Sequence, residues 1–367
     1  MATLKELKEW WDGFYKAVKS SPTILPERYA FPAEHTGRPA QERFKRDQHY
    51  FTVTVNRIFL KYSREFWTTY APMALAVSEF SYDGNDTVVP FVVGPQMLEK
   101  NKIDLPEGFI FADTKVAGVN AYKGDGLKLT VILYRVKRND LAGKLLKVVE
   151  NLASVLDFSQ ALSSYLKIAH VLVDTVGEVI GSDKDNQPII GLRKEFNEAD
   201  DFKPGYFALI EREKTPVPKE QLWVRDNELV VGKDRDSAQE FTGANFVLYS
   251  INQTTWRDDY DQLPFYVQWK TALAESFTAD PEKWKSACAN WTTLYQMMAL
   301  SPDLLPSQAD ELADRCYAQM NEKHEKIKSA AGRMGPATAA AAPGQDKDLS
   351  ALSARLDLIR AKSVSVL

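Results

Sequence analysis

The hydrophobic pattern is strongest between residues 127 and 196. Leu127–Lys137 has the alternation of a strand, with apolar residues on both faces, and such a strand requires cover on both sides. In residues 139–181, apolar positions recur every three or four residues, which predicts two antiparallel helices in a hairpin. Residues 189–196 then predict another strand. We expect the hairpin to cover one face of the 127–137 strand and a second sheet to cover the other.

The rest of the chain between residues 46 and 252 follows a period of two. Turn pairs such as Asp83-Gly84 and Asp226-Asn227 separate the apolar runs and predict tight hairpins. Pro90 lies inside the second run of the first hairpin, which places that strand at a sheet edge. Short strands at this spacing favour an antiparallel sandwich over a parallel α/β sheet. The predicted runs are 50–55, 72–80, 87–93, 109–112, 114–122, 205–211, 222–225, 228–231 and 245–251.

Beyond residue 252 the period becomes helical. A first helix is predicted over 258–277, with Pro264 near its start, and Asp280-Pro281 provides a cap and first turn for a second helix that ends near Leu300. A third helix is predicted from Ser307 to about Ser329.

The end of the chain predicts a tethered helix. Residues 330–347 have the composition of a flexible linker. The segment 348–367 that follows carries a last amphipathic helix, whose apolar face contains Leu349, Leu352, Leu356 and Ile359.

The predicted fold class is therefore α+β: an antiparallel β-sandwich with an inserted α-helical hairpin, followed by a C-terminal helical region. Five parts are expected along the chain. They are an N-terminal amphipathic helix and extended segment (1–45), the sandwich (46–252) with its hairpin (139–181), a helical region (253–329), a linker (330–347) and the tail helix (348–367).

Composition and charge exclude several classes of function. The chain has 46 basic and 50 acidic residues and a net charge of -4, which gives no global attraction to nucleic acid or to an anionic membrane. Cys288 and Cys316 match no zinc or redox spacing, so we expect two buried or half-buried thiols in a reducing compartment, with a disulfide across two helices as the alternative. A basic start with an apolar core is missing at the N-terminus, and no run of about 18 apolar residues occurs, so a cytoplasmic protein is expected.

Motifs for catalysis are weak, and we assign no catalytic or cofactor-binding residue. The glycine turn 123–126 precedes a strand instead of a helix, so it does not fit a dinucleotide site, and no G-x-S-x-G sequence occurs. His170 has Asp174 one helical turn away, a spacing more typical of a surface ion pair than of a general base. A hydrolase with dispersed catalytic residues is one alternative, and His170 and His324 would be the first residues to mutate.

Among possible cofactors, calcium has the most support in the sequence. Aspartates crowd the predicted loops, but the segment 181–188 places Gln187 and Pro188 where an EF-hand needs a ligand and a glycine. A second alternative is therefore a calcium- or lipid-responsive sandwich that acts at a membrane surface, with Trp10 and Trp11 as contacts. The loop aspartates are Asp83, Asp86, Asp183, Asp185, Asp200, Asp201, Asp234, Asp236, Asp258, Asp259 and Asp261.

The favoured hypothesis is a non-enzymatic protein-interaction or assembly module of a larger cytoplasmic complex. An isolated helix as short as the tail helix is marginal in water, so if it forms it should dock on its own domain, on another copy or on a different protein. A disordered tail is the alternative. The residues expected to bind a partner are Leu349, Leu352, Leu356 and Ile359.

Overall fold

The structure is a computed structural model. It describes residues 25–65, 67–94, 109–137, 187–197, 202–212 and 217–333, together with Glu9 and Lys16. The predicted N-terminal helix, the hairpin at 139–181 and the tail beyond residue 333 lie outside this part of the chain.

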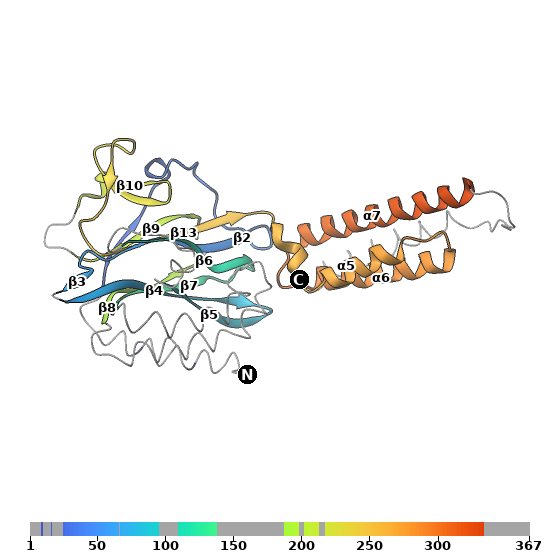
Figure 1. Cartoon of the computed structure of the whole chain (residues 1–367), viewed down its shortest axis with the longest axis horizontal. Helices are drawn as coiled ribbons and strands as arrows, with labels where there is room; N and C mark the ends of the chain where they lie inside the picture. The colour runs from blue at the N-terminus through green and yellow to red at the C-terminus, as the bar shows by residue number, and fades with distance from the viewer. Residues whose placement is uncertain are drawn as a thin grey trace.

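Two large antiparallel sheets, a small third sheet and a projecting arm of helices form the described molecule (Figure 1), which confirms the predicted α+β class and the sandwich. The first sheet has the order β1-β9-β13-β2-β6. Its strands are β1 (Glu27–Ala30), β9 (Gly205–Ile210), β13 (Phe246–Thr254), β2 (Tyr50–Phe59) and β6 (Phe109–Ala121).

The second sheet has the order β3-β4-β7-β8, with β5 paired to β4. Its strands are β3 (Arg64–Glu65), β4 (Thr68–Tyr82), β5 (Asn85–Val93), β7 (Leu127–Lys137) and β8 (Gln187–Phe196). In the described part of the chain the only strand laddered with β5 is β4, so the prediction that Pro90 lies on an edge strand is confirmed.

The core between the sheets follows the strand period. Alternate residues of β7, from Leu127 to Leu133, face Val53 and Val55 of β2 and Val247 of β13. The intervening residues Ile132, Tyr134 and Val136 are also buried, on the opposite face of the second sheet. The predicted two-sided burial of this strand is confirmed, whereas the hairpin expected to cover the second face lies outside the described residues.

A third, small sheet is attached to the first by a buried ion pair network. It comprises β10 (Leu222–Arg225), β11 (Glu228–Val231) and β12 (Gln239–Glu240). The guanidinium of Arg57 on β2 is completely buried and contacts Glu228 at 2.9 Å and also Glu240. Charge pairing therefore fixes the small sheet against β2.

Two expectations need correction. Residues 109–122 were expected to hold two short strands, but β6 is continuous, and Asp113 takes φ +32° where the register with β2 shifts. The extra residue is absorbed as a bulge instead of a turn. The first predicted helix is divided at Pro264 into η3 (Asp258–Gln262) and α5 (Tyr266–Glu275), because proline disrupts the helical hydrogen bonds that precede it.

Residues 25–37 add two further elements to the sandwich. β1 pairs with β9 within the segment expected to be extended, and the short helix η1 (Ala33–His35) follows it. A second short helix, η2 (Lys219–Gln221), leads into β10.

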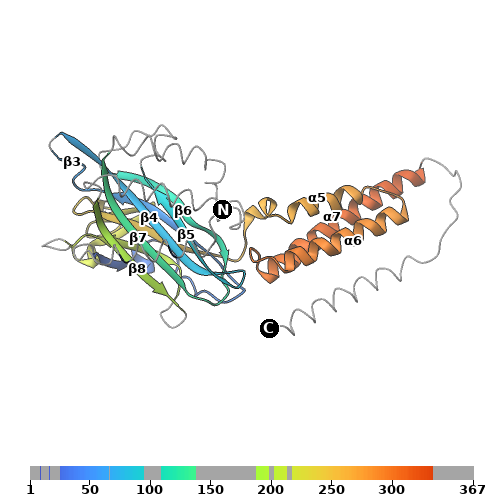
Figure 2. The same ribbon diagram turned by 90° about the horizontal axis from the view of Figure 1, so that it is seen from below.

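The arm consists of α5, α6 (Pro281–Ala299) and α7 (Pro306–Arg333) and points away from the sandwich (Figures 1 and 2). Asp280 caps α6 as predicted, because its Oδ1 accepts a hydrogen bond from the Glu282 N–H at 2.9 Å. α7 continues past Ser329 into the residues predicted as linker, since no proline interrupts it before position 336. Among the described helices, none has the length and apolar character needed to cross a membrane.

Candidate functional site: the helical arm and its joint

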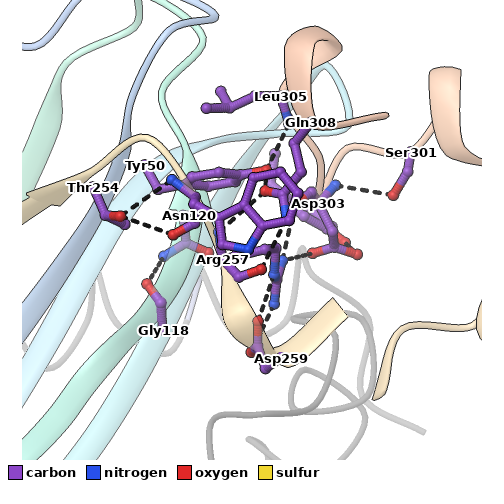
Figure 3. A network of polar contacts seen from close by, with 12 residues as sticks. Tyr50, Gly118, Asn120, Thr254, Arg257, Asp259, Ser301, Asp303, Leu305 and Gln308 are labelled. Carbon is purple, nitrogen blue, oxygen red and sulfur yellow. Dashed lines mark hydrogen bonds and ion pairs between the residues drawn. The ribbon is translucent and has the colours of Figure 1, made fainter. Parts of the chain in front are cut away.

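A buried polar network connects the arm to the sandwich (Figure 3), and we call this network the joint. Arg257 lies between β13 and η3, and its side chain is 2% exposed. Its Nε and Nη2 donate to the carboxylate of Asp259 at 2.7 and 3.0 Å, and its Nη1 donates to the carbonyl oxygen of Asp303 at 2.9 Å. One guanidinium therefore holds together the start of the arm and the loop before α7.

Both sheets reach this network. The Tyr50 hydroxyl of β2 donates to Gln308 Oε1 at 2.7 Å and accepts from the Leu305 N–H at 2.8 Å. Gln308 in turn donates from Nε2 to the Arg257 carbonyl oxygen at 2.8 Å. From the second sheet, the Tyr82 hydroxyl donates to Asp303 Oδ2 at 3.0 Å. Directional bonds to two sheets fix the angle at which the arm leaves the sandwich.

Charge is retained inside the joint. Burial lowers the pKa of Arg257, but the hydrogen bond and the charge of Asp259 more than offset this and raise the pKa above its ordinary value. Burial raises the pKa of Tyr50, so its hydroxyl keeps the proton that it donates to Gln308. At neutral pH Arg257 therefore stays charged and Tyr50 stays protonated, and every donor described above is directed at an acceptor.

The arm has a hydrophobic core of its own. Trp291 of α6 is 3% exposed, and its indole N–H donates to the Ala313 carbonyl oxygen of α7 at 2.9 Å. Trp269 of α5 and Leu312 of α7 belong to the same cluster, which shares no residue with the core between the sheets. The three helices therefore pack as a unit, and the joint links this unit to the sandwich.

Cys316 reports on the packing of the arm. It is fully buried in the arm core, and burial raises the pKa of its thiol to about 12. The thiolate is the reactive form, so the raised pKa keeps the Cys316 thiol protonated and unreactive at pH 8. We expect iodoacetamide at pH 8 to leave Cys316 unlabelled in the native protein and to label it in denaturant, as measured by peptide mass spectrometry. Rapid native labelling of Cys316 would contradict this packing.

After Lys285, the exposed side of α6 carries no charge. Between Lys285 and Asp303 the sequence contains no charged residue, although surface helices normally present charged residues to water. Met297 is 41% exposed and Leu300, just after the helix, is 83% exposed. We define the α6 face as Ala289, Thr293, Met297 and Leu300, all exposed and spaced by three or four residues. An uncharged helix face of this kind is typical of a surface that packs against another helix.

The residues predicted to bind a partner cannot be placed against this face. Leu349, Leu352, Leu356 and Ile359 lie outside the described residues. The same holds for His170 with Asp174 and for Trp10 and Trp11.

His324, the other histidine of the hydrolase alternative, contacts α6 and the turn before it from its position on α7. Its ring stacks on Trp284 with 4.2 Å between the ring centroids, and its side chain lies 2.6 Å, at Nδ1, from the Thr278 carbonyl oxygen. Because a carbonyl oxygen only accepts, Nδ1 carries the proton. His324 therefore fastens α7 to the turn between α5 and α6.

Two of the loop aspartates, Asp234 and Asp259, bind neighbouring side chains. Asp234 accepts hydrogen bonds from the Ser237 N–H at 2.9 Å and from its hydroxyl at 2.7 Å, and Asp259 binds Arg257. Asp83 lies in the β4–β5 turn with φ +51°. Within the described ranges no three His, Cys, Asp or Glu side chains are grouped to hold a metal ion. Residues 183, 185, 200 and 201 lie outside those ranges.

A pocket of about 420 Å³ lies at the end of the second sheet, between β4, β5, β7 and β8. Its two basic residues are each paired with an acidic one: Arg193 with Glu79 at 2.8 Å, and Lys128 with Glu195 at 3.7 Å. Asp86 and Asp125 add further negative charge to the lining. The pocket thus has no excess of positive charge to bind an anion, and the α6 face is the stronger candidate site.

The sequence pattern identified the buried side of α6 but not its exposed side. The sequence places Trp284, Trp291, Leu294 and Met298 at helical spacing, which favours a core position for them. Trp291, Leu294 and Met298 are buried, and Trp284 is partly buried against the same cluster. The absence of charge between residues 285 and 303 was the available signal for the α6 face.

In comparisons with known proteins, no family model, no curated protein and no solved structure matches this chain.

Proposed function

We propose that this chain is a non-enzymatic assembly module that joins copies of itself through the helical arm. In this proposal the α6 face of one copy takes the tail segment 348–362 of a second copy. The observation that carries the proposal is the uncharged, exposed α6 face on an arm whose orientation is fixed by the buried joint.

The apolar residues of the two surfaces have matching spacings. Those of the tail segment recur every three or four positions, as do the residues of the α6 face. Side chains at this spacing interdigitate when two helices pack lengthwise. The tail residues that would pack on the α6 face are Leu349, Leu352, Leu356 and Ile359.

The length of chain beyond α7 is sufficient for this exchange. α7 has 28 residues and ends at the far end of the arm (Figure 1). Segment 334–347 spans at most about 48 Å when extended, and an α6 of 19 residues is about 28 Å long. The tail therefore reaches the α6 face of an adjacent arm. Swapping a terminal element between identical chains is a low-cost route to a dimer.

The test is the mass of the particle in solution. The full chain is expected to sediment as a dimer or larger assembly at micromolar concentration, and a chain that ends at Arg333 as a monomer. Leu300→Glu in the full chain is expected to give monomers as well, because it places a charge in the apolar contact. Lys285→Glu, an exposed change near the start of the same helix, is the matched control and should leave the assembly unchanged.

Two results would overturn the proposal. One is an identical mass for the full chain and for the chain that ends at Arg333. The other is a monomeric full chain whose tail is protected from protease only while Leu300 is intact, since that result places the tail on its own arm.

A further inference from the structure

The β3–β4 hairpin projects an aromatic tip at the end of the molecule away from the arm (Figures 1 and 2). Its two strands pair through Glu65 and Thr68, and Trp67 directly precedes β4 at the free end of the hairpin, which we call the tip. Trp67 is 98% exposed and Tyr62, at the base of the hairpin, is 65% exposed. An indole left almost wholly in water is stabilised when an apolar layer covers it, so Trp67 is the candidate contact residue of this hairpin.

Basic residues surround this tip. Arg64 is exposed on β3, and Lys61 lies with its Nζ 5.5 Å from the centre of the Tyr62 ring. Arg135 of β7 lies over the Tyr70 ring at 4.2 Å, with its Nη1 3.1 Å from Glu65. Lys137, the last residue of β7, is paired in register with Tyr70 of β4.

Two acidic residues of the described chain lie near the hairpin. Besides Glu65, Glu211 is tied to the base of the hairpin, because Asn245 links the Lys61 N–H to the Glu211 carboxylate. Among the described residues near the tip, the basic side chains Lys61, Arg64, Arg135 and Lys137 thus outnumber the acidic Glu65 and Glu211, although the chain as a whole has a net charge of -4.

We propose that the hairpin tip docks on an anionic lipid membrane, with Trp67 inserted at the level of the lipid headgroups. Trp and Tyr favour the membrane–water interface, where the ring is in an apolar layer and the N–H or O–H meets polar groups. Basic residues next to the tip meet anionic headgroups, and each adds to the attraction within a Debye length of the surface.

The shape of the tip favours a membrane over a protein partner. Stable protein interfaces bury about 800 Å² on each side, which needs a broad complementary surface. The short β3–β4 hairpin, with Trp67 exposed at its end, offers a point of insertion instead. A bilayer accepts such a point without a matching pocket, and its anionic headgroups complement Lys61, Arg64 and Arg135.

Vesicle flotation tests the proposal with the full chain. Wild-type protein is expected to float with vesicles of phosphatidylcholine and phosphatidylserine and not with phosphatidylcholine alone. Trp67→Ala should reduce the bound fraction about tenfold and Trp67→Phe much less, while Arg64→Glu should also reduce it about tenfold by reversing one charge. EDTA should leave binding unchanged, because basic side chains supply the attraction directly.

Matched controls separate insertion from general effects of mutation. Val267→Ala removes a side chain that is 72% exposed on the arm, and Lys285→Glu reverses an exposed charge there, so both should bind as wild type does. Circular dichroism should show the fold of Trp67→Ala intact, since the replaced side chain has no buried contact to lose. Equal flotation of Trp67→Ala and wild type would overturn the proposal. A wild-type protein that does not float with the anionic vesicles would also overturn the proposal. In that case Trp67 could still contact a protein partner, but the membrane would not be its target.

Discussion

Replacing Arg257 with methionine is expected to lower the free energy of unfolding by about 3–5 kcal/mol, because the change leaves buried acceptors without their donor. Arg257 is 2% exposed, and its partner Asp303 is 7% exposed. Methionine fills much of the same volume, so the loss reports mainly on the charge and hydrogen bonds. Urea denaturation monitored by circular dichroism measures it.

In this variant we expect the arm to take a wider range of orientations relative to the sandwich, in addition to the loss of stability. Small-angle scattering of the chain that ends at Arg333 is expected to show a broader distribution of distances for Arg257→Met than for wild type. Lys326→Ala, on the exposed distal part of α7, is the control and should leave both measurements unchanged. A variant with wild-type stability and scattering would show that the network does not hold the arm.

Replacing Trp291 with alanine is expected to cost about 3–5 kcal/mol, and the cost should fall on the arm. Trp291 fills the centre of the arm core and loses both its packing and its bond to Ala313. Hydrogen exchange with mass spectrometry should show faster exchange in α5, α6 and α7 and unchanged exchange in β2, β4 and β7. Cys316 should become reactive to iodoacetamide in the same sample.

This selectivity follows from the separate cores of the two parts. Val267→Ala serves as a control, because its side chain is exposed on α5 and its loss should alter neither part. Equal acceleration of exchange in the strands and the helices would mean that the sandwich and the arm unfold as a single unit.

The strongest sequence patterns gave elements at their observed positions. β7 has the predicted bounds, Leu127–Lys137, because apolar residues on both faces leave few other places for the segment. α6 begins as predicted because Asp280 and Pro281 act through local geometry alone. Where the pattern was irregular, as at Asp113 and between residues 62 and 70, the bulge and the hairpin tip depend on pairing with distant strands.

The polar network of the joint could not be predicted from the sequence, for a different reason. Tyr50, Arg257 and Gln308 come from three distant parts of the chain, and each is ordinary in its local pattern. Their shared role arises only from the packing of β2 and β13 against α7. Likewise, periodicity placed Met298 in the core but did not reveal that Leu300, two positions on, is exposed.

Photocrosslinking from position 300 tests most directly whether the α6 face takes the tail of a second copy. A photoreactive phenylalanine analogue at position 300 is incorporated in the full chain, with ¹⁵N-labelled and unlabelled protein mixed before irradiation. The account predicts crosslinked peptides from residues 348–362, with the two isotopes joined in the same product. Crosslinks confined to one isotope, or directed to other segments of the chain, would contradict it.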